Sequence, residues 1–370
     1  MTTLQLPADG TWLGRIDRRG IGPSVVTLRD GVLIDITSKV APTVRDILER
    51  DDATHYVQAA EGTPIGTVSD DHDWLAPCDF QSVKACGVTF ARSMVERVIE
   101  EQAAGDPDKA EGIRARIGAR IGDSLSNIVP GSDEAMAVKA ALIEEGLWSQ
   151  YLEVGIGPDA EVFSKAQVLS SVGHGQDVGL HPVSTWNNPE PEIVLAVNSK
   201  GAIKGAALGN DVNLRDVEGR SALLLSKAKD NNASCAIGPM IRLLDDGYTL
   251  DDVRTAELTL TVRGTDGFVL EGHSSMREIS RDPTDLVRQT IGRHHQYPDG
   301  FMLFLGTLFA PTQDRDTRGG GFTHKIGDIV EIANPSLGTL RNTVKLSTDC
   351  PEWTFGATAL MRNLAARGLL

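Results

Sequence analysis

The chain has 370 residues, of which 36 are lysine or arginine and 51 are aspartate or glutamate, so its formal net charge is −15. An acidic chain lacks the basic face that binds a polyanion, which argues against a nucleic-acid-binding protein. No stretch approaches the ~20 apolar residues that span a bilayer, and the first residues lack the pattern of a signal peptide. We therefore expect a cytoplasmic protein that acts on small molecules and has no membrane partner.

Residues 1–72 are predicted to form a small β-rich domain. Short runs of branched residues predict three strands, at 11–16, 24–28 and 32–36. Asp30-Gly31 supplies the turn between the last two, and a short helix follows at 43–49. The polar stretch 69–73 marks a boundary, so we expect a second domain at 73–370.

Residues 90–152 change to apolar spacings of three and four, which is typical of helices. Asp106-Pro107 and Pro130-Gly131 divide this stretch into three helices. After Gly155 the pattern returns to strands, with one helix around 285–294. Two strand pairs are expected here, 257–262 with 267–270 and 329–332 with 339–344. The predicted fold class is mixed α+β, mostly β, with a helical excursion.

The most informative segment is a predicted hairpin formed by residues 187–197 and 202–210. Side chains alternate along a strand, so Glu190 and Glu192 should lie on one face. A turn centred on Ser199 and Lys200 would pair Gly209 with Glu190, which places Asp211 just past that end of the ladder. Three carboxylates should therefore converge.

Converging carboxylates repel one another unless a cation lies between them. A hard divalent ion with oxygen ligands removes that cost, and three carboxylates leave coordination positions for water and a chelating substrate. Two acids that flank a proline also occur on ligand-free surface loops, so Glu190 and Glu192 alone leave both interpretations open.

Over about residues 75–370 the sequence resembles the fumarylacetoacetate hydrolase superfamily. The matching positions are Glu190, Glu192, Gly205, Gly209, Asn210, Asp211, Arg215, Glu218, Lys227, Gly327-Asp328 and the run 338–344. The resemblance implies the family's mixed β-roll, usually dimeric, so we expect a homodimer or a larger homo-oligomer. It also implies that Glu190, Glu192 and Asp211 hold Mg²⁺ or Mn²⁺.

The resemblance assigns further residues around the metal. Arg215 and Lys227 match the family's cationic positions, and Thr307 matches a substrate-contacting threonine. Without the resemblance, Arg215 and Lys227 would be interpreted as solvated surface residues. Glu218 belongs to the matched set, and two more residues are expected to contact sugar hydroxyls, Asn232 and Ser234.

The chain departs from the hydrolytic members at residues 87–96. Those members carry Gly-x-Asn-Tyr-x-x-His-x-x-Glu, whose histidine and glutamate activate water. Here Glu96 is kept but Ser93 occupies the histidine position, and a serine without a neighbouring base is a poor proton acceptor. The predicted catalytic residues are Glu96, Lys227 and Ser93, with Glu96 as the group that transfers protons.

A metal ion chelated by a 2-oxo acid stabilises the enolate formed when C3 loses a proton, and a C4 hydroxyl can then leave as water. The segments 186–213 and 227–235 most resemble the dehydratase branch of the superfamily. The implied reaction converts a 2-keto-3-deoxypentonate, derived from xylonate or arabinonate, into 2-oxoglutarate semialdehyde. Two alternatives remain open: hydrolysis of an acylpyruvate or a 2,4-diketo-3-deoxy sugar acid, and non-catalytic binding of a sugar acid.

Overall fold

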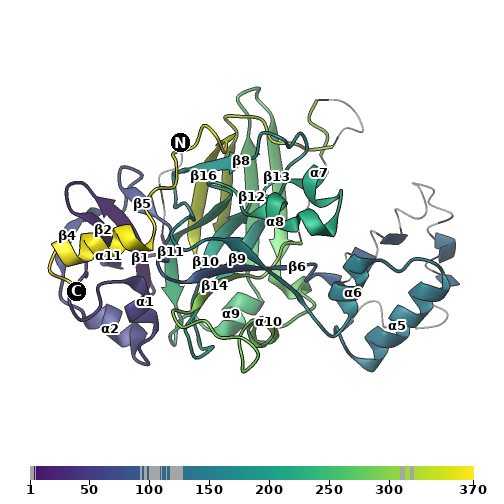
Figure 1. The fold of residues 1–370 in the computed structure, drawn as a ribbon, viewed down its shortest axis with the longest axis horizontal. Coiled ribbons are helices and arrows are strands. Elements are labelled where there is room, and N and C mark those ends of the chain that lie inside the picture. The colour runs from purple at the N-terminus through teal and green to yellow at the C-terminus, as the bar shows by residue number, and fades with distance from the viewer. Residues whose placement is uncertain are drawn as a thin grey trace.

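The computed structural model describes residues 4, 6–91, 94–95, 98–99, 109, 111–113, 115–116, 128–308, 313–316 and 321–370. In this part of the chain the strands form two sheets (Figure 1). The larger consists, in spatial order, of β4 (Thr63–Thr67), β3 (Val32–Asp35), β2 (Gly22–Arg29), β1 (Trp12–Arg18), β11 (Cys235–Leu243), β10 (Ile203–Asp211), β9 (Pro191–Val197), β14 (Phe301–Phe304), β6 (Ser82–Gly87) and β7 (Glu161–Ala166). An additional strand, β5 (Asp73–Leu75), pairs with β1.

The smaller sheet has the order β13 (Val269–Ser275), β12 (Glu257–Arg263), β15 (Ile329–Asn334), β16 (Gly338–Leu346) and β8 (Asp177–Leu180). Both predicted strand pairs are present, because β12 pairs with β13 and β15 pairs with β16, each antiparallel. Five short helices accompany the two sheets: α1 (Val44–Leu48), α2 (Ala53–Ala59), α7 (Arg215–Glu218), α8 (Leu225–Lys229) and α9 (Leu250–Arg254). The predicted mixed fold, mostly β, is confirmed.

The central strands are buried on both faces. Every residue of β9 is buried, which fits the apolar run at 193–197 that follows Glu192. On one face Leu195 and Leu208 belong to a core cluster with Ile332 of the smaller sheet. On the other face Val194 belongs to a cluster that includes Ile47 of α1. The hairpin β9–β10 is therefore held rigidly between two apolar layers.

The N-terminal strands continue the larger sheet. β1 pairs antiparallel with β11 through Trp12↔Arg242 and Leu13↔Ile241. The C-terminal helix α11 (Ala357–Ala366) returns to the same region, where Asn363 Nδ2 donates to the carbonyl of Ile21 at 2.8 Å (Figure 1). The three predicted N-terminal strands agree with β1, β2 and β3. A domain boundary at residue 72 stays a prediction.

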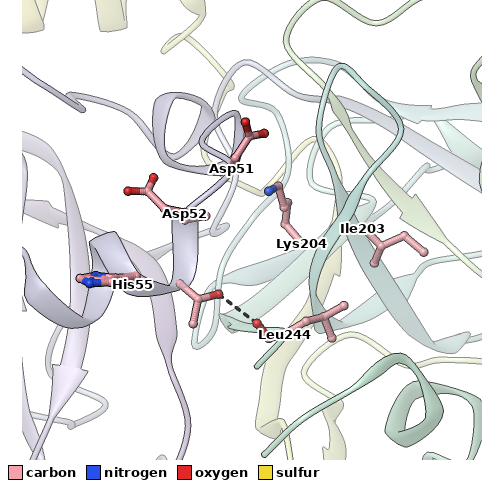
Figure 2. Close-up of a pocket in the computed structure, with 8 residues that line it drawn as sticks. Asp51, Asp52, His55, Ile203, Lys204 and Leu244 are labelled. Carbon is pink, nitrogen blue, oxygen red and sulfur yellow. Dashed lines mark hydrogen bonds between the residues drawn. The ribbon is translucent and has the colours of Figure 1, made fainter. Parts of the chain in front are cut away.

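Helix α2 contacts the central strands directly. Thr54 Oγ1 donates to the carbonyl of Leu244 at 2.9 Å, drawn as the dashed line in Figure 2. Lys204 Nζ donates to the carbonyl of Arg50 at 2.7 Å. Thr54, Lys204 and Leu244 line a concavity of about 220 Å³, and Figure 2 shows Asp51 among its other lining residues. Its lining includes none of the predicted site residues.

The helical excursion lies at one end of the molecule (Figure 1). Its described helices are α5 (Asp133–Glu144) and α6 (Gln150–Ile156). The Ser132 side chain caps α5 by accepting from the backbone N–H of Ala135. The two predicted helices before Pro130 fall largely outside the described residues, and Ser93 and Glu96 lie outside them as well.

The helix expected around 285–294 is α10 (Pro283–Thr290), and it ends earlier than predicted. Its C-terminal neighbour Ile291 has extended backbone, and Gly292 and His295 then exchange backbone hydrogen bonds in a turn. Glycine in the last predicted turn favours this exit from the helix. None of the helices in the described ranges is both long and apolar enough to cross a membrane.

Candidate metal centre

The register of the β9–β10 hairpin brings Asp211 directly opposite Glu190. The Asp211 N–H donates to the Glu190 carbonyl at 3.0 Å, and Gly209 pairs with Glu192. The prediction that Gly209 pairs with Glu190 is therefore wrong by two residues. The cause is the connection, because the Asn198 N–H donates to the carbonyl of Ala202 and the register shifts again before Gly205.

The three carboxylates meet at the open end of this hairpin. One oxygen from each of Glu190, Glu192 and Asp211 lies within 4.8 Å of the others. Glu192 and Asp211 are almost fully buried, with 2% and 1% of their surface exposed. Burial raises the pKa of Glu190 to about 7, although the charge of Lys229 lowers it. Burial, then the charges of Asp211 and Glu190, raise the pKa of Glu192 well above its usual range.

Hydrogen bonds orient two of these carboxylates. The Gly306 N–H donates to Glu192 Oε2 at 2.6 Å, and Asn213 Nδ2 donates to Glu190 Oε1 at 3.0 Å. Gly306 has φ of +91°, and a Cβ there would come within 2.2 Å of Thr89 Oγ1, so only glycine fits. Asp211 Oδ1 is buried, and the ammonium of Lys165 lies 2.8 Å from it. A buried carboxylate oxygen is a ligand type that a hard divalent ion prefers.

Two buried lysines contact the carboxylates. Lys229 Nζ lies 2.6 Å from Glu190 Oε2 and 3.0 Å from Asp211 Oδ2. Burial alone would lower the pKa of Lys229, but the charges of Asp211 and Glu190 outweigh it and raise the pKa well above its usual value. Lys165 Nζ, from β7, lies 2.8 Å from Asp211 Oδ1. We did not predict either lysine from the sequence.

Lys227, the predicted catalytic lysine, lies elsewhere. Its side chain is exposed and its Nζ lies 3.4 Å from His181 Nε2. Lys227 and Lys229 are both on α8, where residues two apart point to nearly opposite sides. Lys229 therefore faces the carboxylates while Lys227 faces outward. The buried Ala228 next to Lys229 shows which side of α8 packs on the protein.

The predicted substrate contacts lie at several places. The Arg215 guanidinium lies 4.8 Å from the centre of the Trp186 ring. Glu218 is half-buried, and its charge raises the pKa of Glu190, after burial and the stronger influences of Lys229 and Asp211. Thr307 is half-buried and follows Gly306, whose N–H holds Glu192. These three residues come from α7 and from the segment after β14.

Asn232 and Ser234 are bonded to the protein itself. Asn232 Nδ2 donates to the carbonyls of Ser347 and Pro351, at the edge of a cavity of about 800 Å³. Ser234 Oγ donates to the carbonyl of Lys229 at 2.8 Å and is buried. Ser234 thus holds the loop that follows Lys229, and contacts with sugar hydroxyls stay a prediction for both residues.

Glu161, at the start of β7, is a further acidic residue near the cluster that we did not predict. Burial raises its pKa, and the charge of Glu218 raises it further. The side chain lies against Gly87 of β6, where a Cβ would come within 1.9 Å of Glu161 Oε2. Glycine at position 87 therefore makes room for this carboxyl. No sequence signal identifies Glu161, because its pairing with Gly87, the glycine that starts the motif at 87–96, depends on the register of β6 and β7.

Residues 158–345 match the family described as fumarylacetoacetate (FAA) hydrolase, C-terminal, and the chain belongs to this family. The 2-dehydro-3-deoxy-D-arabinonate dehydratase of Saccharolobus solfataricus is 32% identical over 188 residues, covering 50% of this chain and 58% of the relative. The probable 2-keto-3-deoxyxylonate dehydratase of Haloferax volcanii is 30% identical over 201 residues, covering 54% and 65%. Each match spans less than two thirds of the relative's length.

Solved structures establish the fold. A 2-keto-3-deoxy-D-arabinonate dehydratase in its apo form has a TM-score of 0.63 at 22% identity, covering 90% of this chain and 99% of that one. The same enzyme complexed with magnesium and 2,5-dioxopentanoate has a TM-score of 0.61 with the same coverage. A fumarylacetoacetate hydrolase from Exiguobacterium antarcticum has a TM-score of 0.56 at 15% identity, with 91% and 99% covered. The predicted fumarylacetoacetate-hydrolase-like fold is confirmed.

Proposed function

We propose that this chain is a metal-dependent hydro-lyase that converts a 2-keto-3-deoxypentonate into 2-oxoglutarate semialdehyde (2,5-dioxopentanoate) in non-phosphorylative pentose catabolism. The observation that carries the proposal is the buried group Glu190, Glu192 and Asp211 on this fold. Two curated relatives are dehydratases of such acids by name. A structural relative was solved with magnesium and 2,5-dioxopentanoate.

The donor set fits Mg²⁺ or Mn²⁺. Both ions prefer carboxylate oxygens, and one oxygen from each of the three residues lies within 4.8 Å of the others. Glu190, Glu192 and Asp211 would hold the ion. When bound, it supplies a Lewis acid that polarises the carbonyl of a 2-oxo acid and lowers the cost of negative charge after C3 loses a proton.

The protein side chains then bind substrate and move protons. Arg215 and Lys229 are cations suited to the substrate carboxylate and the developing negative charge. Glu96 takes the proton from C3. Glu161, whose pKa is raised by burial, is assigned as the group that donates a proton to the C4 hydroxyl, which leaves as water.

Hydrolysis of an acylpyruvate is the competing reaction, and it needs a base that activates water. Ser93 replaces the histidine that performs this task in hydrolytic members. The dehydration needs proton removal at C3, proton donation at C4, and a final tautomerisation that moves a proton from C5 to C3 to give the 5-aldehyde. None of these steps needs an activated water. The substitution at position 93 therefore supports elimination over cleavage of a C–C bond.

The test is to incubate the purified protein and Mg²⁺ with 2-keto-3-deoxypentonates and, separately, with acylpyruvates, and to follow products by mass. Loss of one water from a pentonate, abolished by excess EDTA, supports the proposal. Release of pyruvate from acylpyruvates with the pentonates untouched would replace it with the hydrolase. Saturable binding of a 2-oxo acid with no turnover of either substrate would favour a non-catalytic binding protein.

The proton-transfer roles have their own test. Glu96→Gln should lower kcat for the pentonate much more than it changes KM, because the carboxylate acts in the transition state. Glu161→Gln should also lower kcat. If kcat stays within a few-fold of the parent value, the activation free energy has changed by less than ~1 kcal/mol. That residue would then have no part in the mechanism. Light scattering of the same preparations tests the predicted homodimer or larger assembly.

A further inference from the structure

Lys165 is a fully buried lysine with no assigned role. It lies on β7 with none of its surface exposed. Its ammonium group lies 2.8 Å from Asp211 Oδ1 and donates to the carbonyls of Val212 and Lys229. An isolated buried ammonium is costly, so this arrangement depends on the charge of Asp211.

The three N–H donors of Lys165 have three protein acceptors. One ion pair and two backbone hydrogen bonds account for what an ammonium can offer. Lys165 is therefore committed to the protein and can act on a ligand only through its charge and through the groups that it holds. Those groups are the third carboxylate and the backbone of Lys229.

The charges in direct contact fix what this group can bind. In the fully ionised form that binds a metal, Glu190, Glu192 and Asp211 carry three negative charges and the contacting Lys229 and Lys165 carry two positive charges, so these five side chains sum to −1. One divalent ion changes this to +1, which attracts one anion. Without Lys165 the same five positions would carry −2, favouring the metal and disfavouring the anion.

We propose that Lys165 is a positioning residue whose buried charge balances the carboxylate group, so that it takes one divalent ion and then a monoanionic 2-oxo acid. This inference rests on the metal site of the proposed function. Lys165 has opposite effects on the two ligands: its charge weakens the binding of the metal ion and strengthens the binding of the 2-oxo acid.

The experiment measures two affinities by calorimetry, first Mn²⁺ binding to the metal-free protein and then pyruvate binding at saturating Mn²⁺. Lys165→Met and Lys165→Gln should bind Mn²⁺ at least about tenfold more tightly, because even water-like screening leaves a large interaction between a unit charge and a divalent ion a few ångströms away. Both should bind pyruvate about fivefold more weakly, because a monoanion has half the interaction with a unit charge that a divalent ion has at the same distance.

Two matched variants isolate the charge. Lys165→Arg keeps the charge and should keep both affinities near the parent values. Lys84→Met removes a half-buried lysine from the adjacent strand β6, where its Nζ contacts Ser164 Oγ, and should change neither affinity. A purely structural role for Lys165 would instead weaken both ligands together in the neutral variants.

Each outcome decides the matter. Opposite shifts in the two affinities support the inference, whereas parallel losses overturn it. It also fails if both neutral variants do not fold while Lys165→Arg does, since the charge would then serve the fold and not the ligands. If the parent itself binds neither Mn²⁺ nor Mg²⁺, the proposed function fails, and this result is distinct from any pattern among the variants.

Discussion

Replacing Lys229 by methionine tests whether that lysine neutralises the carboxylates in the metal-free protein. The side chain is 4% exposed and contacts Glu190 and Asp211 at 2.6 and 3.0 Å. Removing one partner of a buried ion pair costs about 3–5 kcal/mol. Asp211 keeps Lys165 as a partner, so we expect the lower value, about 3 kcal/mol.

That loss translates into a measurable change in melting temperature. The unfolding entropy of about 2.1 cal/mol/K per residue, applied to 370 residues, makes 3 kcal/mol equal to roughly 4 °C. Thermal melts in EDTA should therefore show Lys229→Met about 4 °C below the parent. Saturating Mg²⁺ should reduce the difference, because the ion supplies positive charge to the same oxygens and binds the variant more tightly.

Lys227→Met is the matched control, two residues away on the same helix. Its exposed side chain contacts only the neighbourhood of His181 in the described structure, so its removal should cost no more than about 0.5 kcal/mol, below 1 °C. Equal melting losses for the two variants, or a Lys229→Met protein that melts with the parent in EDTA, would refute the assignment of Lys229 to the carboxylate cluster.

Three further outcomes follow from the structure. Glu192→Gln should weaken Mg²⁺ binding by more than about 100-fold, which exceeds the usual effect of losing a group that only hydrogen-bonds to a metal ligand. Glu271→Gln, at an exposed position, should leave Mg²⁺ binding unchanged. Equal calorimetric affinities for the two variants would contradict the assignment of Glu192 as a ligand. Arg315→Met should lower the free energy of unfolding in urea by about 3 kcal/mol, because the fully buried Asp328 loses guanidinium contacts at 2.6 and 2.7 Å and keeps only those with His324 and the Lys325 N–H. A change under about 1 kcal/mol would show that the pair is dispensable. Burial lowers the pKa of His174 below 6.5, so the unfolded chain binds the proton more readily than the folded protein, and the free energy of unfolding should fall as the pH drops through 6.5. Between pH 7.5 and 5.5, His174→Gln should therefore lose less stability than the parent. An equal loss would exclude His174 as the cause.

The sequence alone determined the features that depend on local rules. Alternation along a strand was enough to predict that Glu190 and Glu192 share one face, and the turn between two apolar runs was enough to predict a hairpin with Asp211 just past its end. The predicted strand pairs and the family resemblance rest on the same kind of short-range pattern. The register did not follow, because it depends on how the backbone closes at Asn198 and shifts near Gly205.

Only the tertiary structure decided which cations complete the site. The sequence does not distinguish Lys227 from Lys229. The side of α8 that packs against the protein buries Lys229 and leaves Lys227 exposed to solvent. Lys165 lies 46 positions before Asp211, on a strand that reaches it only through the folding of the sheet. A charged lysine is costly to bury without a carboxylate partner, and only the complete fold brings Lys165 and Lys229 to Asp211.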